Sequence, residues 1–427
     1  MRIQNRDALA HTPLRVQALA VIEAGFAVID TDAVVRRNVA IHNDSLSVGD
    51  KSFPLKDIRR LIVVGVGKCA SEAAYTLEQL LGDRIDEGIV LDVQCRPRLQ
   101  HITFYKGTHP FPSRANSDAT ERIIALLKDA GEGDVVIFII SGGGSTLLHT
   151  EEDISTEDER CVLKHLFASG ATIQEINTIR KHLSHARAGF LARYAYPARS
   201  AALIFSDVPT NDPQFIASGP TVRDITTVAD AQAVLERYDV YRVCPLKTAL
   251  IDTPQEDRYF AHAYSKIVVS NKHALDAMVL WAQSMGFTPR ICTTSLAGEA
   301  REMGKRIIDE LHTALPHTAL LYGGETTVKL TGDGTGGRNQ ELVLACVPYV
   351  EEGELIVSVA SDGNDNTDVA GALCDTITKE RARVLSLDAA VYLQKNDSYH
   401  FFEQVGDHIV TGHTGSNVSD IVLAIKL

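Results

Sequence analysis

Short apolar runs alternate with longer segments of helical periodicity along the first half of the chain. The runs are dominated by Val, Ile and Leu, which is typical of strands buried on both faces of a parallel sheet. The alternation predicts a mainly parallel sheet whose strands are joined by right-handed βαβ crossovers. The predicted strands are residues 61–64, 88–92, 135–140 and 201–205, and the predicted helices are 13–40, 70–81, 117–128 and 175–194.

A second alternation of the same kind follows the polar stretch 223–262, where we place the domain boundary. Residues 328–331 resemble the second arm of a hairpin. The pattern predicts two α/β/α domains, residues 1–235 and 236–427, of which the first is Rossmann-like with a mainly parallel sheet. The further predicted strands are 266–270, 290–294, 319–322, 355–360 and 421–425, and the further predicted helices are 274–286 and 299–313.

Composition narrows the class of protein. The chain has 427 residues, a net charge of −13 and a hydrophobic fraction of 45%, which is enough for two globular domains. The acidic balance argues against nonspecific nucleic-acid binding and against binding to anionic membranes, although a local basic site can still take a small anion. No segment approaches the roughly 18 apolar residues that a membrane span requires. The apolar stretch 18–29 is interrupted by Glu23 and predicts an amphipathic helix rather than a signal peptide.

The seven cysteines are scattered, odd in number and free of any CxxC pair. This pattern predicts reduced thiols in a cytoplasmic protein, with neither a disulfide framework nor a zinc site.

Gly65 and Gly67 follow the first predicted strand, and with Ala70 they match the GxGxxA dinucleotide fingerprint. Asp92 ends the next strand, near the place of a ribose-binding acid. A tight strand-to-helix turn explains the glycines equally well. Lys68 favours an anion site, since a lysine beside glycine amides suits phosphate or carboxylate. The segment is not a Walker A loop, because Cys69 stands where that motif needs Ser or Thr.

Glycine and acidic loops follow three further strands. The run 141–145, Ser-Gly-Gly-Gly-Ser, predicts a nest of backbone amides for an anion, although a flexible loop would also accept glycines. Asp207 and Asp212 lie where ligands bind in open α/β sheets and could hold Mg²⁺, but Asp is also an ordinary turn residue. Asp362 is a candidate base or metal ligand, whereas the nearby Asp365 and Asp368 are predicted to be turn and helix-cap residues.

Arg338 lies in the run Gly-Gly-Arg-Asn-Gln-Glu at 336–341, where a strand gives way to a helix. A cation beside small residues and amides suits an anionic ligand. The loop 411–417 offers hydroxyls and an amide for phosphate or a polyol, but reads equally well as a plain turn. The basic residues between 180 and 187 are predicted to form a solvated helix face.

Together these segments resemble the MOFRL-type glycerate 2-kinases over nearly the whole chain. That family transfers the γ-phosphoryl group of ATP to the 2-hydroxyl of D-glycerate. One departure is Thr210-Asn211-Asp212, which stands where the family usually has Gly-Asp-Asp. The most specific stretches are 63–70, 107–112, 140–148, 175–184, 206–221, 323–342, 361–372 and 411–420.

The resemblance implies a cytoplasmic kinase with ATP and D-glycerate as small-molecule substrates, Mg²⁺ as cofactor and a homodimer as one possible assembly. It also implies an active site in the cleft between two α/β domains. Lys68 and Arg338 would bind the transferring phosphate and the glycerate carboxylate, while Asp207 or Asp362 would hold Mg²⁺ or accept the hydroxyl proton. The remaining implied contacts are Gly65, Gly67, Ser141, Gly142, Gly143, Gly144 and Ser145 to nucleotide phosphates, His109, Asn339, Thr414 and Asn417 to substrate, and Asp212 to the metal.

Two other classes of protein compete with this interpretation. An NAD(P)H-dependent hydroxypyruvate reductase would use the GxGxxA match and Asp92, but it has no need of Lys68 in the turn. A sugar-acid or nucleotide sensor could share the fold without catalysing a reaction.

Overall fold

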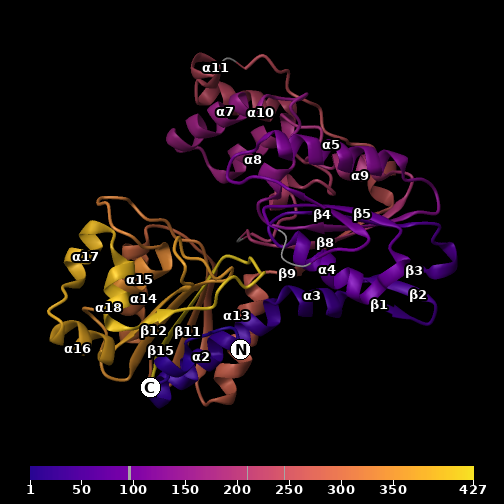
Figure 1. Ribbon diagram of the computed structural model, residues 1–427. Coiled ribbons are helices and arrows are strands. Elements are labelled where there is room, and N and C mark those ends of the chain that lie inside the picture. The colour runs from indigo at the N-terminus through magenta and orange to yellow at the C-terminus, as the bar shows by residue number, and fades with distance from the viewer. Residues whose placement is uncertain (95–97, 209, 245) are drawn as a thin grey trace. The chain divides into compact units, whose positions relative to one another are not determined.

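The computed structural model describes residues 1–94, 98–208, 210–244 and 246–427, and the chain forms two compact units (Figure 1). The continuous unit is residues 34–268. The split unit combines residues 1–33 with residues 269–427. This division differs from the boundary expected at residue 235, because the first helices pack with the second half of the chain.

The continuous unit is built on a six-stranded sheet of order β6-β5-β4-β7-β8-β9. The β6–β5, β5–β4, β4–β7 and β7–β8 ladders are all parallel, as expected from the apolar runs. Numbered from β4, the order is 3-2-1-4-5-6, that of doubly wound dinucleotide-binding sheets. The strands are β4 (Leu61–Val66), β5 (Glu87–Asp92), β6 (Ile102–Lys106), β7 (Val135–Ile140), β8 (Arg199–Phe205) and β9 (Ala263–Val269).

Helices cover both faces of this sheet. Figure 1 shows α4 (Ala70–Leu81) on one face and α5 (Arg114–Asp129) with α9 (Phe190–Ala195) on the other. A small antiparallel sheet, which the sequence did not predict, precedes β4. Its strands are β1 (Val39–His42), β2 (Ser45–Val48) and β3 (Lys51–Pro54).

The predicted long helix 175–194 is wrong. Helix α8 (Ile173–His182) ends early, and the chain turns before α9 begins at Phe190. Ala188 and Gly189 take left-handed φ values of 49° and 82°, which no helix interior accommodates. A side chain at Gly189 would lie 2.9 Å from the carbonyl oxygen of Val222, so the turn packs tightly.

A disulfide closes a helical layer above the sheet. Cys161 in α7 (Thr156–Ala168) is bonded to Cys244, with Cα atoms 5.9 Å apart. The expectation of reduced thiols throughout is therefore wrong for this pair, since a disulfide between distant positions leaves no spacing motif. Cys69, Cys292, Cys346 and Cys374 are free thiols, and Cys95 lies outside the described residues. The layer shares one apolar cluster and consists of α7, α8, α10 (Val228–Arg237) and α11 (Val240–Val243).

The split unit contains a mixed sheet of order β10-β11-β15-β12-β13-β14. Only the β10–β11 ladder is parallel, and the other four are antiparallel. The predicted hairpin arm at 328–331 is wrong, because the described chain is irregular there. The strands are β10 (Thr288–Leu296), β11 (Thr318–Gly324), β12 (Glu354–Ala360), β13 (Gly371–Asp375), β14 (His408–Ile409) and β15 (Asp420–Lys426).

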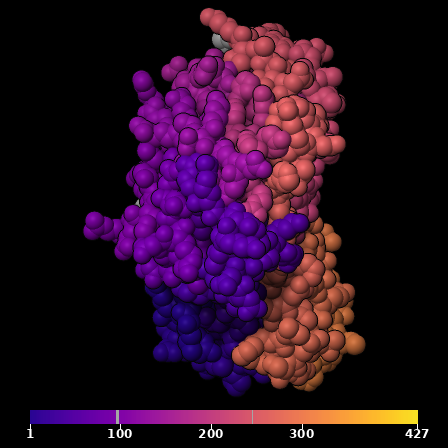
Figure 2. All heavy atoms as spheres, turned by 90° about the vertical axis from the view of Figure 1, so that its right-hand side faces the viewer, coloured from indigo at the N-terminus to yellow at the C-terminus, as the bar shows by residue number. Residues whose placement is uncertain are grey.

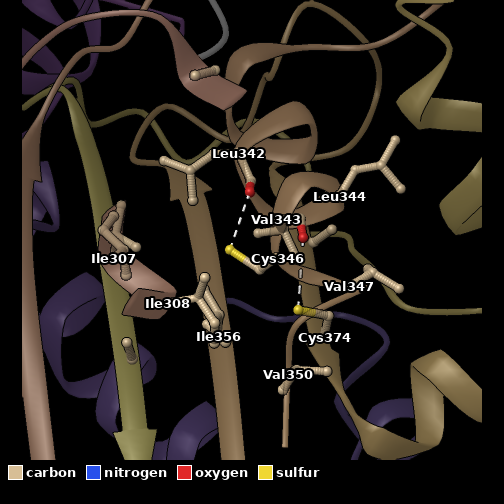
Figure 3. Packing of buried hydrophobic residues seen from close by; sticks show 14 of the residues in the cluster. Ile307, Ile308, Leu342, Val343, Leu344, Cys346, Val347, Val350, Ile356 and Cys374 are labelled. Atoms are coloured by element: carbon tan, nitrogen blue, oxygen red, sulfur yellow. Dashed lines mark hydrogen bonds between the residues drawn. The ribbon is translucent and has the colours of Figure 1, made fainter. Parts of the chain in front are cut away.

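The core of the split unit lies between this sheet and helices α14 (Ala300–Thr313) and α15 (Arg338–Cys346). Figure 3 shows Cys346 and Cys374 inside that core, where their thiols donate to the carbonyl oxygens of Leu342 and Val343. Burial raises the pKa of both thiols well above the ordinary value, so they behave as small apolar side chains.

The other face of the sheet is covered by α2 (Pro13–Ile29) and α13 (Asn271–Ser284). The two helices approach closely, since a side chain at Gly25 would lie 3.0 Å from the sulfur of Met278. Figure 2 accordingly shows the indigo N-terminal residues beside the orange residues of the same unit. The remaining helices of the split unit are α1 (Arg6–Leu9), α3 (Thr31–Asn38, which continues into the continuous unit), α16 (Thr376–Val384), α17 (Ala389–Lys395) and α18 (Ser398–Val405).

Arg15 ties α2 to the opposite end of the chain. Its guanidinium donates to Asp375 at 2.7 Å and to Asp407 at 2.6 Å, and its side chain is fully buried. Although burial alone would lower the pKa of Arg15, the two carboxylates raise it above the ordinary value. The buried cation is therefore matched by fixed partners.

Replacing Arg15 by Leu should lower the free energy of unfolding by about 3–5 kcal/mol, because it leaves Asp375 buried without its cation and Asp407 with only Arg381 at 3.4 Å. Urea unfolding and the melting temperature would measure the loss. Arg383→Ala is the matched control, since Arg383 pairs with the exposed Glu380, and it should leave the melting temperature unchanged. An Arg15→Leu variant as stable as that control would contradict the prediction.

Candidate functional site

A glycine turn follows the central strand of the continuous unit. Gly143, with a left-handed φ of 83°, starts the short helix α6 (Gly144–Leu147) directly after β7. The amide of Lys68, which follows the neighbouring strand β4, donates to the carbonyl oxygen of Gly142 at 2.9 Å. A side chain at Gly67 would lie 2.1 Å from the Ser141 hydroxyl, so only glycine fits there.

Lys68 and His109 converge on Gly143. A side chain placed at Gly143 would meet Lys68 Cε at 3.3 Å and His109 Cδ2 at 3.5 Å. The glycine therefore leaves a space into which an ammonium and an imidazole both face. Three residues from separate predicted motifs are thus brought together.

Positive charge dominates this space. Loss of surrounding water, and then the charges of Lys68 and Arg180, lower the pKa of His109 to about 4. The pKa of Arg180 is itself lowered to about 10, because burial and Arg187 outweigh the attraction of Glu159. Within the described residues, Arg180 Nε is buried without a hydrogen-bond partner. The arrangement suits a ligand that carries two negative charges.

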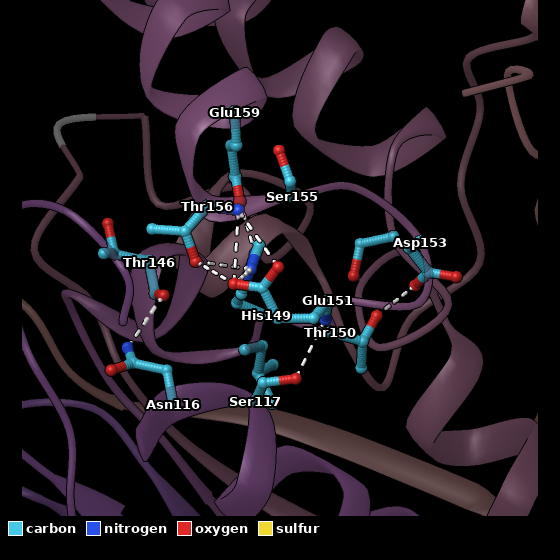
Figure 4. A network of polar contacts seen from close by, with 12 residues as sticks. Asn116, Ser117, Thr146, His149, Thr150, Glu151, Asp153, Ser155, Thr156 and Glu159 are labelled. Atoms are coloured by element: carbon cyan, nitrogen blue, oxygen red, sulfur yellow. Dashed lines mark hydrogen bonds and ion pairs between the residues drawn. The ribbon is translucent and has the colours of Figure 1, made fainter. Parts of the chain in front are cut away.

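A buried polar network adjoins the short helix that follows the turn (Figure 4). Glu159 accepts from Arg187 at 2.8 Å and lies 2.7 Å from His149 Nδ1. Burial raises the pKa of Glu159, but Arg187 and His149 overcome this effect and hold it at about 2. Asn116 then donates to the carbonyl oxygen of Thr146 and holds the end of the turn in place.

The predicted solvated face at 180–187 is wrong, because most of these side chains are buried and paired. Lys181 binds Asp224 at 2.9 Å and is 2% exposed. Arg187 is completely buried against Glu159. A basic run on a helix looks the same in sequence whether solvent or buried carboxylates face it, so the sequence alone does not single out Arg180.

Two predicted phosphate-binding hydroxyls have structural roles. The hydroxyl of Ser145 accepts from Ser218 at 2.8 Å, and that of Ser141 accepts from the amide of Cys69 at 3.3 Å. Both residues are almost fully buried. Any contact of this segment with a ligand therefore rests on its backbone and its glycines.

The loop after β8 carries an oxygen-rich set of side chains. Asp207 is half-buried, and its charge adds to the burial that raises the pKa of Cys69 to about 12. Asp212 accepts from the amide of Gln214 at 2.9 Å, as a turn residue does. Within the described chain, Asn211 Oδ1 is buried with no hydrogen-bond partner. Carboxylate and amide oxygens of this kind are what Mg²⁺ prefers.

Asp92 is not available to a nucleotide ribose. Its carboxylate is completely buried and accepts from the amide and the hydroxyl of Ser71 at 3.0 and 2.9 Å. Burial raises the pKa of Asp92 despite these bonds. The residue therefore stabilises the first turn of α4, which contradicts the ribose-binding interpretation.

Arg338 begins α15 in the split unit and is bound by two carboxylates. It donates to Asp420 at 2.6 and 2.9 Å and pairs with Glu325 at 2.8 Å. Burial raises the pKa of Asp420 to about 7, although Arg338 opposes that shift. The guanidinium is held in one orientation and remains 31% exposed.

Asp365 caps α15, a helix that lies before it in the chain and to which the sequence did not assign it. Its carboxylate accepts from the backbone amides of Asn339 and Gln340 at 3.0 and 2.9 Å. The Asn339 side chain is buried between Asp365 and Ser358, to which it is hydrogen-bonded. It therefore offers no surface for the substrate contact that the resemblance implied.

Asp362 lies next to the loop 411–419. The half-buried Asp362 accepts from the amide of Asn364 at 2.9 Å. Thr414 is buried and donates to the carbonyl oxygen of Ser361 at 2.5 Å, so its hydroxyl orders the loop instead of reaching a ligand. Asn417 is partly exposed and stays a predicted substrate contact.

Comparison with known proteins places the chain in a family. Residues 17–250 match the family model described as a domain of unknown function, DUF4147, and residues 318–420 match the MOFRL family. A D-glycerate 2-kinase from Thermotoga maritima is 34% identical over 88% of this chain and 93% of its own length. The crystal structure of a glycerate kinase from Thermotoga maritima superposes with a TM-score of 0.83 at 32% identity, covering 96% of this chain and 99% of that one. A relative from Agrobacterium vitis, 38% identical over 87% of this chain and 88% of its own, bears the provisional name hydroxypyruvate reductase.

His109 should remain neutral throughout the physiological range. Its folded-state pKa of about 4 lies below the ordinary 6.5, so it takes up a proton only as the pH falls towards 4. An NMR titration of the imidazole protons, assigned with His109→Gln, would measure the midpoint. His400 provides an internal control, because Asp397 raises its pKa. Inorganic phosphate should raise the His109 midpoint, and a midpoint near 6.5 without phosphate would refute the surplus of positive charge.

Proposed function

Because the chain belongs to the MOFRL family of glycerate 2-kinases, we propose that it transfers the γ-phosphoryl group of ATP to the 2-hydroxyl of D-glycerate. The observation that carries this proposal for the chain itself is the convergence of Lys68 and His109 beside Gly143, where the charge of Arg180 also lowers the pKa of His109. Phosphoryl transfer asks the protein mainly for positioning and charge neutralisation.

Lys68 and Arg180 are proposed to bind the phosphoryl group as it moves. Two cations in a partly buried site attract the negative oxygens more strongly than they would in water. The neutral His109 would donate a hydrogen bond to the phosphoryl group, and it adds no third positive charge to those of Lys68 and Arg180. The glycines at 142–144 let phosphate oxygens approach the backbone.

The oxygens of Asp207, Asn211 and Asp212 are proposed to hold Mg²⁺, whose chemistry in kinases is to neutralise phosphate charge. The orphaned oxygen of Asn211 fits this role, because a buried acceptor without a donor is otherwise costly. Asp207 and Asp362 stay the two candidates for accepting the proton of the substrate hydroxyl.

Arg338 is proposed to bind the glycerate carboxylate or a phosphate. Asp420 grips two nitrogens of the guanidinium and orients it, while the half-exposed Glu325 is the partner that an incoming anion can replace. Arginine binds either anion in a bidentate manner. Cytoplasmic location and a homodimer stay predictions, and no described helix has the length and apolar character of a membrane span.

The second candidate activity is an NAD(P)H-dependent hydroxypyruvate reductase, which the name of the Agrobacterium vitis relative favours. The buried Asp92 removes the acid that this reading assigned to the ribose. Purified protein that oxidised NADH with hydroxypyruvate, and formed no ADP from ATP, Mg²⁺ and D-glycerate, would establish the reductase instead.

Lys68→Ala and Arg180→Ala should each lower kcat/KM about a hundredfold or more, since one lost transition-state contact is worth about 3 kcal/mol. A coupled assay of ADP release would measure the rates, and NMR of the product would locate the phosphate on the 2-oxygen. Lys128→Ala is the control, because Lys128 is an exposed lysine of the same unit. Equal rates in all three variants would remove the proposed phosphate site.

A further inference from the structure

A histidine and two glutamates meet at the edge of the split unit where β12 begins. The ligand atoms of His312, Glu351 and Glu354 all lie within 4.8 Å of one another. Asp362 and Arg338 stand at other places in the fold, beyond the far end of β12 and at the start of α15. The proposed phosphoryl transfer uses none of these three residues.

The chain builds this cluster from a helix end and a turn. His312 occupies the last turn of α14. The amide of Glu354 donates to the carbonyl oxygen of Glu351 at 3.1 Å, and Glu354 Oε2 accepts from the amide of Glu351 at the same distance. Gly353 allows the turn with a left-handed φ of 80°. Two carboxylates three residues apart are thereby directed to one place.

Two ligand atoms of the cluster are left without hydrogen-bond donors or acceptors in the described structure. Glu354 is 1% exposed, yet its Oε1 makes no hydrogen bond, and neither does the buried Nε2 of His312. A buried carboxylate oxygen without a partner is costly, and so is a buried imidazole nitrogen. Such atoms require an explanation, and one cation between them would satisfy both.

The nearest cation, Lys426, does not supply a hydrogen bond to the unpartnered Oε1 of Glu354. Lys426 Nζ lies 3.5 Å from Glu354 Oε1, but its hydrogen bonds go to the carbonyl oxygens of His312 and Leu311 at 2.9 and 3.4 Å. The ammonium is held by the helix end, which satisfies carbonyls that α14 leaves open. Its charge offsets part of Glu354 and leaves the ligand atoms themselves available.

We propose that His312, Glu351 and Glu354 form a binding site for a first-row divalent cation of the zinc class. One imidazole and two carboxylates match the mixed nitrogen and oxygen ligands of Zn²⁺, whereas Mg²⁺ and Ca²⁺ prefer oxygen alone. His312 Nε2 lies 3.2 Å from Oε2 of the Glu354 carboxylate, and Oε1 of that carboxylate is the oxygen left for the ion. Water would complete the coordination, and the exposed Glu351 provides the entry path.

The ion would join the end of α14 to the start of β12, two elements that both contribute side chains to the apolar core of the split unit. Binding to the folded state alone raises its stability by mass action. The site is therefore structural in character, and its occupancy can be followed without any assay of catalysis.

The test uses the full chain, stripped of metal by a chelator and titrated with Co²⁺ in the presence of millimolar Mg²⁺ to fill all-oxygen sites. We expect one Co²⁺ per chain with a visible absorption band, displacement by Zn²⁺, and a melting temperature that rises with Zn²⁺. His312→Ala and Glu351→Gln should each weaken binding at least tenfold. Glu351 is exposed, so its variant keeps the fold.

His400→Ala is the matched control, because His400 pairs with Asp397 in the same unit without a third ligand, and it should bind Co²⁺ as the parent does. The proposal is overturned if the parent shows no saturable Co²⁺ band, or if His312→Ala binds as tightly as the parent. If His312→Ala has a lower melting temperature than the parent without metal, the Co²⁺ affinity of Glu351→Gln alone decides the test.

Discussion

The ion triad of Arg15, Asp375 and Asp407 is the constraint on which the split unit depends. One guanidinium, completely buried, joins the first long helix to the start of α16 and to the segment before β14. Separating the buried guanidinium from its two carboxylates would leave buried charges without partners, which is strongly destabilising. These three segments are therefore held in a single arrangement. The C-terminal end of the same helix positions the loop 411–419, because Ser416 donates to the carbonyl oxygen of Ile29. Order in a loop that carries candidate functional residues thus begins with packing at the N-terminal helix.

The continuous unit shows the opposite use of charge. Lys68 and His109 lie beside Gly143, and burial together with nearby cations lowers the pKa of His109 and of Arg180. Natural proteins keep such unfavourable arrangements mainly at functional sites. The ion triad in one unit is thus balanced, whereas the positive charge near His109 in the other unit is not, which supports the proposal of an anion site there.

Sequence periodicity predicted the parallel sheet well, because strands buried on both faces read as unbroken apolar runs, and α4 was predicted at its observed bounds. It predicted the split unit less well. The strands of a mixed sheet with two covered faces are as apolar as those of a parallel sheet, so the pattern does not show which strands run antiparallel. The glycine turn and Lys68 could be found from their spacing. Arg180 could not be separated from its buried basic neighbours, and the Cys161–Cys244 pair depends on contacts between residues 83 positions apart. Asn339 and Thr414 have the right chemistry for ligand contacts, but burial directs them inward.

Because the split unit is built from the two ends of the chain, it can fold only late during synthesis. Arg15 and Asp375 are separated by 360 residues, so at about 5–20 residues per second the helix that carries Arg15 waits roughly 20–70 s for its partner during synthesis. Throughout that interval the whole continuous unit can fold, because its own sheet is complete by residue 269. Helix α2 exposes its apolar face until α13 and β12, on which it packs, have been made. A nascent chain of this protein therefore carries a finished domain next to an unpartnered amphipathic helix, the state in which binding by a chaperone has its greatest effect.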